Sequence, residues 1–132
     1  MKALVDTSVW SLALRRKEQS GTTRKLADLV LNSLAVIIGP IRQELLSGIS
    51  DVNTFTLLKT KLEAFEDVRI TTNDYVTAAQ FYNTCRKHGI QGSHTDFLIC
   101  SVACNHHYTI FSTDRDFEHY RRYLPIKLEN NE

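Results

Sequence analysis

The sequence predicts an α/β protein in which helices cover both faces of a mainly parallel sheet of four to five strands. Two observations predict this fold class. Short segments rich in Val, Ile or Phe alternate with longer segments of helical periodicity, which is typical of parallel sheets. One helical segment is apolar nearly all round and therefore belongs in the interior. With 132 residues, the chain is expected to form one domain, residues 1–132, whose core needs no disulfide.

Five segments are expected to be strands, because each is short, apolar and bounded by polar or turn residues. They are Lys2–Val5, Ala35–Ile38, Val68–Ile70, Thr109–Phe111 and, with the weakest pattern, Ile126–Leu128. Helical patterns fill the intervals between them. The expected helices are one that begins near Ser8, then Thr22–Asn32, Pro40–Leu46, Phe55–Phe65, Tyr75–Arg86, Ser93–His106 and Phe117–Tyr123.

Two of these helices are the most informative. Pro40 suits the first turn of a helix that Gly48 can end. The segment Ser93–His106 carries apolar residues on nearly every face, so it is expected to be a buried central helix.

The composition argues against several classes of protein. No apolar run reaches the roughly 18 residues that span a bilayer, and the N-terminus lacks a signal-peptide core, so a cytoplasmic location without membrane contact is expected. The formal net charge of +1 gives no bulk electrostatic argument for nucleic acid. Short basic clusters at Arg15–Lys17 and Arg121–Arg122 are typical of solvated helix faces, although either can also contact RNA.

The three cysteines also have an ordinary interpretation. Cys85, Cys100 and Cys104 are odd in number and form no C-x-x-C pair. On a helix, Cys100, Cys104 and His107 share a face, which leaves a metal site conceivable. Free cysteines are common core residues in a reducing compartment, and we favour that interpretation.

Four carboxylates fall where the carboxyl ends of parallel strands are expected to meet. Asp6 ends the first strand, and Glu44 lies one turn into the helix after the second. Asp96 lies in the opening turn of the buried helix. Asp114 comes three residues after Phe111, and Asp116 follows two residues later. Ligands of such sheets bind outside the carboxyl ends of the strands, so these acids are expected to converge there.

Each acid also has a purely structural explanation. Asp6, Asp96 and either of the last two acids can cap a helix, and Glu44 can be an ordinary surface residue. Helix caps have no reason to gather at one edge of a sheet, so the set as a whole is better explained by a shared site.

A converging set of carboxylates needs a counter-charge. Two carboxylates about 4 Å apart repel by roughly 4 kcal/mol at an effective dielectric constant near 20, so the group must take up protons or bind a cation. Oxygen ligands without His or Cys suit Mg²⁺ or Mn²⁺ better than Zn²⁺. Such an ion activates water and stabilises charge on a phosphoryl oxygen, which predicts phosphodiester hydrolysis. The hydroxyls of Thr7 and Ser8 are placed to orient Asp6 or a metal-bound water.

Four segments in register resemble one family. They are VDTSVW at Val5–Trp10, RQELLSG at Arg42–Gly48, HTDFLICSVA at His94–Ala103 and STDRDF at Ser112–Phe117. The chain resembles PIN-domain proteins of the VapC type, the toxin ribonucleases of toxin–antitoxin pairs. One small departure is Cys100, where the family usually has Ala.

The resemblance implies a three-layer α/β/α sandwich, one or two Mg²⁺ or Mn²⁺ ions, and hydrolysis of RNA. It also implies a homodimer silenced by a small antitoxin protein. Carried over by position, the catalytic and metal-binding residues are Asp6, Glu44, Asp96 and Asp114. Ser8 and Asp116 are expected beside them, although either acid of the last motif can face the metal.

Two other functions fit parts of the sequence. An aspartate-based phosphatase also begins with an Asp at the end of its first strand, but typically has a second acid where this chain has Ser8, and no suitably placed Lys is evident. A catalytically silent PIN-like module that binds RNA or protein would have lost site acids, whereas all four are present here.

Overall fold

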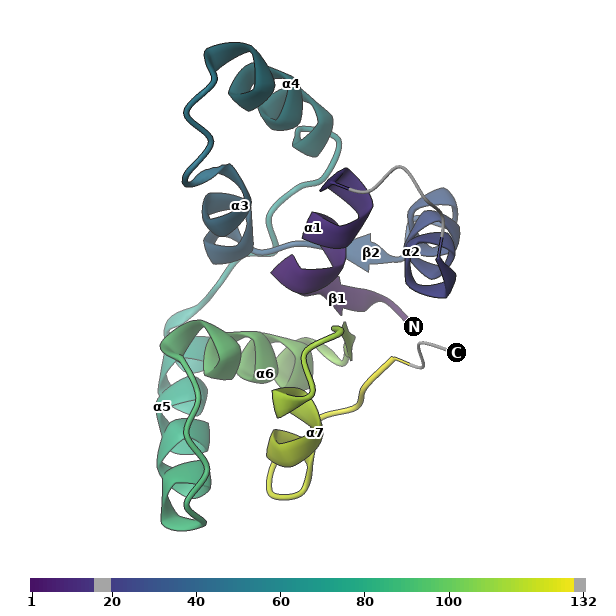
Figure 1. Cartoon of the computed structure of the whole chain (residues 1–132). Coiled ribbons are helices and arrows are strands. Elements are labelled where there is room, and N and C mark those ends of the chain that lie inside the picture. Colours follow the sequence, from purple (N-terminus) through teal and green to yellow (C-terminus); the bar gives the residue numbers. More distant parts are fainter. Residues whose placement is uncertain (16–19, 130–132) are drawn as a thin grey trace.

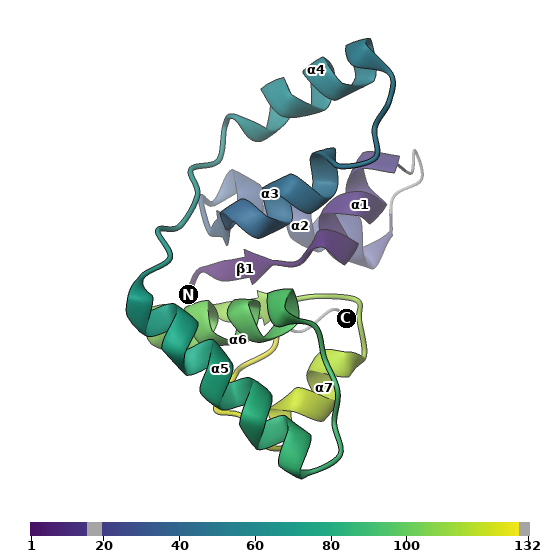
Figure 2. The same ribbon diagram turned by 90° about the vertical axis from the view of Figure 1, so that its left-hand side faces the viewer.

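In the computed structural model, which describes residues 1–15 and 20–129, a parallel sheet lies between two layers of helices (Figures 1 and 2). The central strand β1 (Ala3–Val5) is flanked by β2 (Ala35–Val36) and β3 (Thr109–Phe111), so that the order is β2-β1-β3. In Figure 2, α1 and α3 lie above β1, and α5, α6 and α7 lie below it. The predicted α/β sandwich with a parallel sheet is thus confirmed.

The expected number of four to five strands is wrong, because within the described residues the sheet has three. The expected strand Val68–Ile70 does not form: a single bridge joins Ile37 to Asp67, the residue before it, and the chain then continues into the next helix. The segment Ile126–Leu128 likewise pairs only at Leu128, with Ile110. Both segments run along the sheet edges, but one bridge each is too little pairing to make a strand.

Each expected helix is found, with shifted ends. The helices are α1 (Thr7–Arg15), α2 (Gly21–Leu31), α3 (Gly39–Leu46), α4 (Val52–Leu62), α5 (Thr72–Lys87), α6 (His94–His106) and α7 (Asp116–Arg121). Helix α5 begins three residues before the expected Tyr75 because Thr71 and Asp74 form a capping box. Helix α4 also begins early, because the Asp51 carboxylate accepts the backbone N–H of Thr54.

Helix α6 is the buried central helix that its composition predicts. Its residues from Phe97 to Ala103 are all buried, and it contacts both β1 and β3. Cys100 and Cys85 are each 0 % exposed, and burial raises the pKa of both thiols. These two cysteines are therefore core residues, as expected.

Helix α4 projects from the body of the molecule (Figure 1) and is tied to it by one side chain of α3. The Arg42 guanidinium donates to the carbonyl oxygens of Leu62 (2.9 Å) and Phe65 (2.5 Å) and to Asp67 Oδ1 (2.9 Å). Leu62 is the last residue of α4, so Arg42 satisfies carbonyl groups that a helix C-terminus leaves unpaired.

The register of the sheet places the polar residues that follow the strands. Val5 pairs with Phe111, and the backbone N–H of Asp6 donates to the carbonyl oxygen of Phe111 (2.9 Å). Asp6 and Ser112 consequently leave neighbouring parallel strands side by side. In the part of the chain that the structure describes, no helix is long and apolar enough to cross a membrane.

Candidate functional site

Asp6 lies at the carboxyl end of β1 and is 8 % exposed. Its Oδ2 accepts hydrogen bonds from the hydroxyls of Ser8 (2.9 Å) and Ser112 (2.8 Å). Ser8 Oγ also accepts the backbone N–H of Thr113 (3.1 Å), which ties the start of α1 to the loop after β3. The carboxylate is therefore oriented by two hydroxyls from separate segments, an arrangement that a helix cap alone does not need.

Glu44 reaches the same region from α3. Its Oε1 accepts a hydrogen bond from the Thr7 hydroxyl (2.9 Å), and the side chain is exposed. Thr7 is the first residue of α1 and the neighbour of Asp6 in sequence. The Glu44 carboxylate is thus connected to the end of β1 through Thr7.

Asp96 is the third residue of α6, and its backbone and side chain are held separately. Its N–H donates to Oγ of Ser93, the N-cap residue (3.0 Å). Its Oδ2 accepts a 2.6 Å hydrogen bond from the Tyr120 hydroxyl, which belongs to α7 and is 0 % exposed. Ser93 therefore caps the helix, and the Asp96 carboxylate is left facing α7.

Asp114 and Asp116 complete an acidic cluster with Asp96. One carboxylate oxygen from each of the three residues lies within 4.8 Å of the others. Asp114 N–H donates to Ser112 Oγ (3.0 Å), and Asp114 Oδ1 accepts the N–H of Asp116 (2.9 Å), where α7 begins. Arg115 is the N-cap residue of α7 and makes no side-chain cap bond, so Asp114 holds the turn before the helix with one oxygen while also taking part in the cluster.

The negative charges of these groups act on one another. Burial raises the pKa of Asp96, and the charges of Asp6 and Asp114 raise it further, against the lowering effect of the hydrogen bonds from Tyr120 and Ser93. Among the described side chains, no Lys or Arg forms an ion pair with any of the five acids. A set of carboxylate oxygens without a cationic partner fits a hard divalent cation such as Mg²⁺ or Mn²⁺.

Replacing Asp96 with Asn is expected to stabilise the metal-free protein. A carboxyl whose folded-state pKa is raised contributes most stability at low pH, where it is protonated, and loses that contribution as pH rises through its folded pKa. At pH 7.5 in EDTA, we expect the melting temperature of Asp96→Asn to exceed the wild-type value, because Asn carries no charge for burial and the neighbouring carboxylates to oppose.

The same comparison near pH 4 should show a smaller difference. Asp28→Asn, on the exposed surface of α2, is the matched control and should change little at either pH. A melting temperature of Asp96→Asn equal to or below that of the wild type at pH 7.5 would contradict the electrostatic account.

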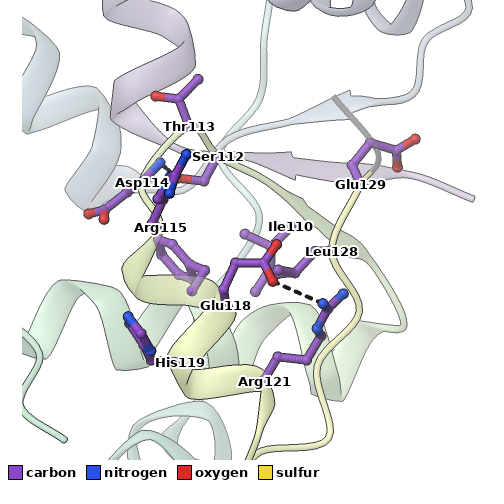
Figure 3. Close-up of a pocket in the computed structure, with 11 residues that line it drawn as sticks. Ile110, Ser112, Thr113, Asp114, Arg115, Glu118, His119, Arg121, Leu128 and Glu129 are labelled. Atoms are coloured by element: carbon purple, nitrogen blue, oxygen red, sulfur yellow. Dashed lines mark hydrogen bonds and ion pairs between the residues drawn. The ribbon is translucent and has the colours of Figure 1, made fainter. Parts of the chain in front are cut away.

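A pocket of about 790 Å³ adjoins the acidic cluster, between α7 and the C-terminal segment. Ser112, Asp114, Arg115, His119 and Arg121 contribute to its lining. Figure 3 shows the Asp114 carboxylate directed away from Glu118 and Arg121, which form an ion pair at 3.0 Å. Asp114 therefore stands at one end of a groove whose lining carries Arg115, His119 and Arg121 together with Glu118 and Glu129.

Two residues at the site were not singled out by the sequence. Ser112 follows β3 directly, as Asp6 follows β1, so the parallel register was the signal that could have revealed it. Tyr120 directly precedes the basic cluster Arg121–Arg122, which gave no indication of a role for it, and it is fully buried. The other basic cluster cannot be placed, because residues 16–19 lie outside the described chain.

Comparison with known proteins agrees with this architecture. The family model described as "PIN domain" matches residues 3–123. The chain belongs to the PIN-domain family. The match spans all three strands and the five acids of the site, so the resemblance seen in the sequence motifs is confirmed for the PIN domain as a whole.

Several solved structures share this PIN-domain fold. FitAcB from Neisseria gonorrhoeae aligns with a TM-score of 0.80 at 20% identity, over 98% of this chain and 97% of that one. DNA-bound VapBC from Salmonella typhimurium aligns with a TM-score of 0.82 at 17% identity, over 99% and 98%. A toxin–antitoxin complex from Klebsiella pneumoniae aligns with a TM-score of 0.66 at 14% identity, over 88% and 90%. At these identities the likeness is one of fold.

Proposed function

We propose that this PIN domain is a metal-dependent endoribonuclease and the toxin of a toxin–antitoxin pair. The observation that carries the proposal is the gathering of Asp6, Asp96, Asp114 and Asp116 at the carboxyl ends of β1 and β3, without a described Lys or Arg in ion pairs with them. Membership of the PIN-domain family supports it.

Each residue of the site has a part in this chemistry. Asp6, Glu44, Asp96 and Asp114, together with Asp116, would hold Mg²⁺ or Mn²⁺. Among them, carboxylate oxygens of Asp96, Asp114 and Asp116 lie within 4.8 Å of one another. When bound, such an ion supplies an activated water and charge stabilisation at a phosphoryl oxygen.

The hydroxyl groups of the chain fix the carboxylates. Ser8 and Ser112 hold Asp6 Oδ2, so the carboxylate is oriented before any ligand arrives. Thr7 holds Glu44 from the first turn of α1. Side chains that are already positioned lose little entropy when the substrate binds, which favours the reaction.

The groove beside Asp114 supports RNA as the substrate. Arg115, His119 and Arg121 line it, and basic side chains supply most of the affinity for a phosphate backbone. One end of the groove lies at the acidic cluster. A strand held along it would bring a phosphodiester bond to the carboxylates.

An antitoxin partner and a homodimer belong to the same proposal. One of the similar solved structures is a toxin–antitoxin complex from Klebsiella pneumoniae, which supports an antitoxin partner. An apolar groove between α1, α3 and α4, lined by Leu14, Leu45, Ile49, Leu57 and Leu58 among others, supports a partner with an apolar segment. The cytoplasmic location stays a prediction.

The direct test is an assay of purified protein on pooled single-stranded RNA, with sequencing of the new ends. We expect endonucleolytic cleavage with Mg²⁺ or Mn²⁺ and none in excess EDTA. The same protein is incubated with DNA of matched sequence and with a chromogenic phosphomonoester.

Each outcome separates one alternative from the proposal. Cleavage that persists in EDTA would contradict the metal site. Release of phosphate from the phosphomonoester without RNA cleavage would favour an aspartate-based phosphatase. RNA binding without cleavage at any metal concentration would favour a silent binding module.

A further inference from the structure

Tyr120 is a buried side chain whose polar end reaches the acidic cluster. Its ring is 0 % exposed and packs against Phe97 and Phe117, with ring centroids 5.0 and 5.3 Å away. Its hydroxyl donates to Asp96 Oδ2 at 2.6 Å. This is the range of a short O–H···O hydrogen bond to an ionised acceptor, which is stronger than a neutral one.

The chain leading into α6 closes over this hydroxyl. Gly92 lies so near that a Cβ atom there would collide with the Tyr120 hydroxyl oxygen, and it would also come within 2.9 Å of Phe97 Cε2. Only a residue without a side chain fits this space. The ring is confined by the two phenylalanines and the hydroxyl by the Gly92 backbone, so Tyr120 cannot turn away from Asp96.

The hydrogen bond from Tyr120 restrains a carboxylate that neighbouring carboxylates repel. The Asp96 carboxylate lies near Asp114 and Asp116, and a free carboxylate would rotate to increase its distance from like charges. A neutral donor fixed in the core opposes that rotation without adding a positive charge that would compete with a cation. The Tyr120 hydroxyl is bonded to Oδ2 of Asp96, so Oδ1 of Asp96 is the oxygen that takes no part in this hydrogen bond.

We propose that Tyr120 is a positioning residue that fixes the Asp96 carboxylate in the orientation needed to bind a divalent cation with Asp114 and Asp116. The inference rests on the proposed metal-dependent function. Ligand-orienting hydrogen bonds of this kind commonly change metal affinity by 10–100-fold. Tyr120 therefore contributes to metal affinity through Asp96, to which its hydroxyl donates.

The test is Mn²⁺ binding to the full chain, measured by calorimetry at pH 7.5, for the wild type, Tyr120→Phe and Asp96→Asn. Tyr120→Phe removes one oxygen and keeps the buried ring. We expect its Kd for Mn²⁺ to rise about tenfold, and its RNA cleavage to recover when the Mn²⁺ concentration is raised by the same factor. Tyr108→Phe is the matched control, because Tyr108 precedes β3 at the opposite end of the strand; its Kd should equal that of the wild type.

The outcomes distinguish this inference from the proposed function. If wild type and Asp96→Asn bind Mn²⁺ equally, or neither binds, the metal site fails and the role of Tyr120 fails with it. If the wild type binds and Tyr120→Phe binds with the same Kd, only the role of Tyr120 is overturned. A loss of cleavage in Tyr120→Phe that added Mn²⁺ cannot restore would also overturn it.

A second measurement, on the wild-type protein, tests the proposal in case the Tyr120→Phe variant does not fold. Wild-type protein with ¹³C-labelled tyrosine is titrated with Mg²⁺, and the ring Cζ resonances are followed by NMR. We expect the Tyr120 resonance to move with saturation of the site while that of Tyr108 stays in place. A Tyr120 resonance that saturating Mg²⁺ leaves unchanged would contradict the proposal.

Discussion

Replacing Asp6 with Asn is expected to lower the rate of RNA cleavage about 10³-fold while leaving the protein folded. Asn keeps the size of the side chain and can still accept hydrogen bonds from Ser8 and Ser112, so the end of β1 keeps its structure. It removes the negative charge that would hold the cation. Metal-derived stabilisation of the transition state amounts to several kcal/mol, and each 1.4 kcal/mol is a factor of ten in rate.

Initial rates at saturating Mg²⁺, with circular dichroism and melting temperature as folding checks, measure this effect. Asp28→Asn on α2 carries the same chemical change outside the site and should cleave at the wild-type rate. Undiminished cleavage by a folded Asp6→Asn protein would remove Asp6 from the site.

Growth of cells that express the same two variants provides a second test. Expression of the wild-type chain alone should arrest growth, and Asp6→Asn should relieve the arrest at equal protein level. Asp28→Asn should arrest growth like the wild type. Harmless expression of a wild-type chain that cleaves RNA in vitro would contradict the toxin part of the proposal and leave the nuclease part standing.

Replacing Arg42 with Met is expected to destabilise the fold by about 3 kcal/mol. The change keeps the aliphatic stem and removes three hydrogen bonds from a charged donor, to Leu62, Phe65 and Asp67. Bonds to charged groups contribute about 1.5–3 kcal/mol each, but the Asp67 carboxylate is partly exposed and its pair with Arg42 is worth less. The Phe65 carbonyl then loses this donor, while the Leu62 carbonyl keeps the backbone N–H of Phe65 (3.1 Å).

Chemical denaturation with urea measures this loss. Arg24→Met, an exposed position on α2, is the matched control and should stay within about 0.5 kcal/mol of the wild type. Arg42→Lys should recover little of the loss, because an ammonium group cannot present the planar fork of donors. An unchanged midpoint in Arg42→Met would mean that α4 is held mainly by its apolar contacts.

The sequence predicted β1 and β3 and overestimated the pairing along the sheet edges, for a physical reason. The pattern of an apolar segment reports burial: β1 is buried throughout, and β3 is buried at Ile110 and Phe111. The length of pairing along a sheet edge depends on how far two distant segments lie side by side. The residues within one segment do not determine this length. Asp67 and Leu128 each form one bridge, and the chain then turns away.

The site was predictable where a residue type coincided with a strand end or a helix start. Asp6, Asp96 and Asp114 were singled out in that way, and the structure groups Asp96 and Asp114 with Asp116. Tyr120 was not predictable, because its role depends on the direction in which α7 packs against α6. An aromatic residue between basic neighbours gives no indication of a buried hydrogen bond to Asp96.

The hydrogen bond between Asp6 and Ser112 joins residues 106 positions apart, which matters for a chain emerging from a ribosome. Synthesis proceeds from the N-terminus at roughly 5–20 residues per second, so β1 and Asp6 are made well before β3. Until β3 pairs with β1, Asp6 lacks Ser112 and Asp96 lacks Tyr120. The nascent chain carries Asp6 and Asp96 without the arrangement that makes them a site, and any activity of that site begins only after β3 and α7 have been made.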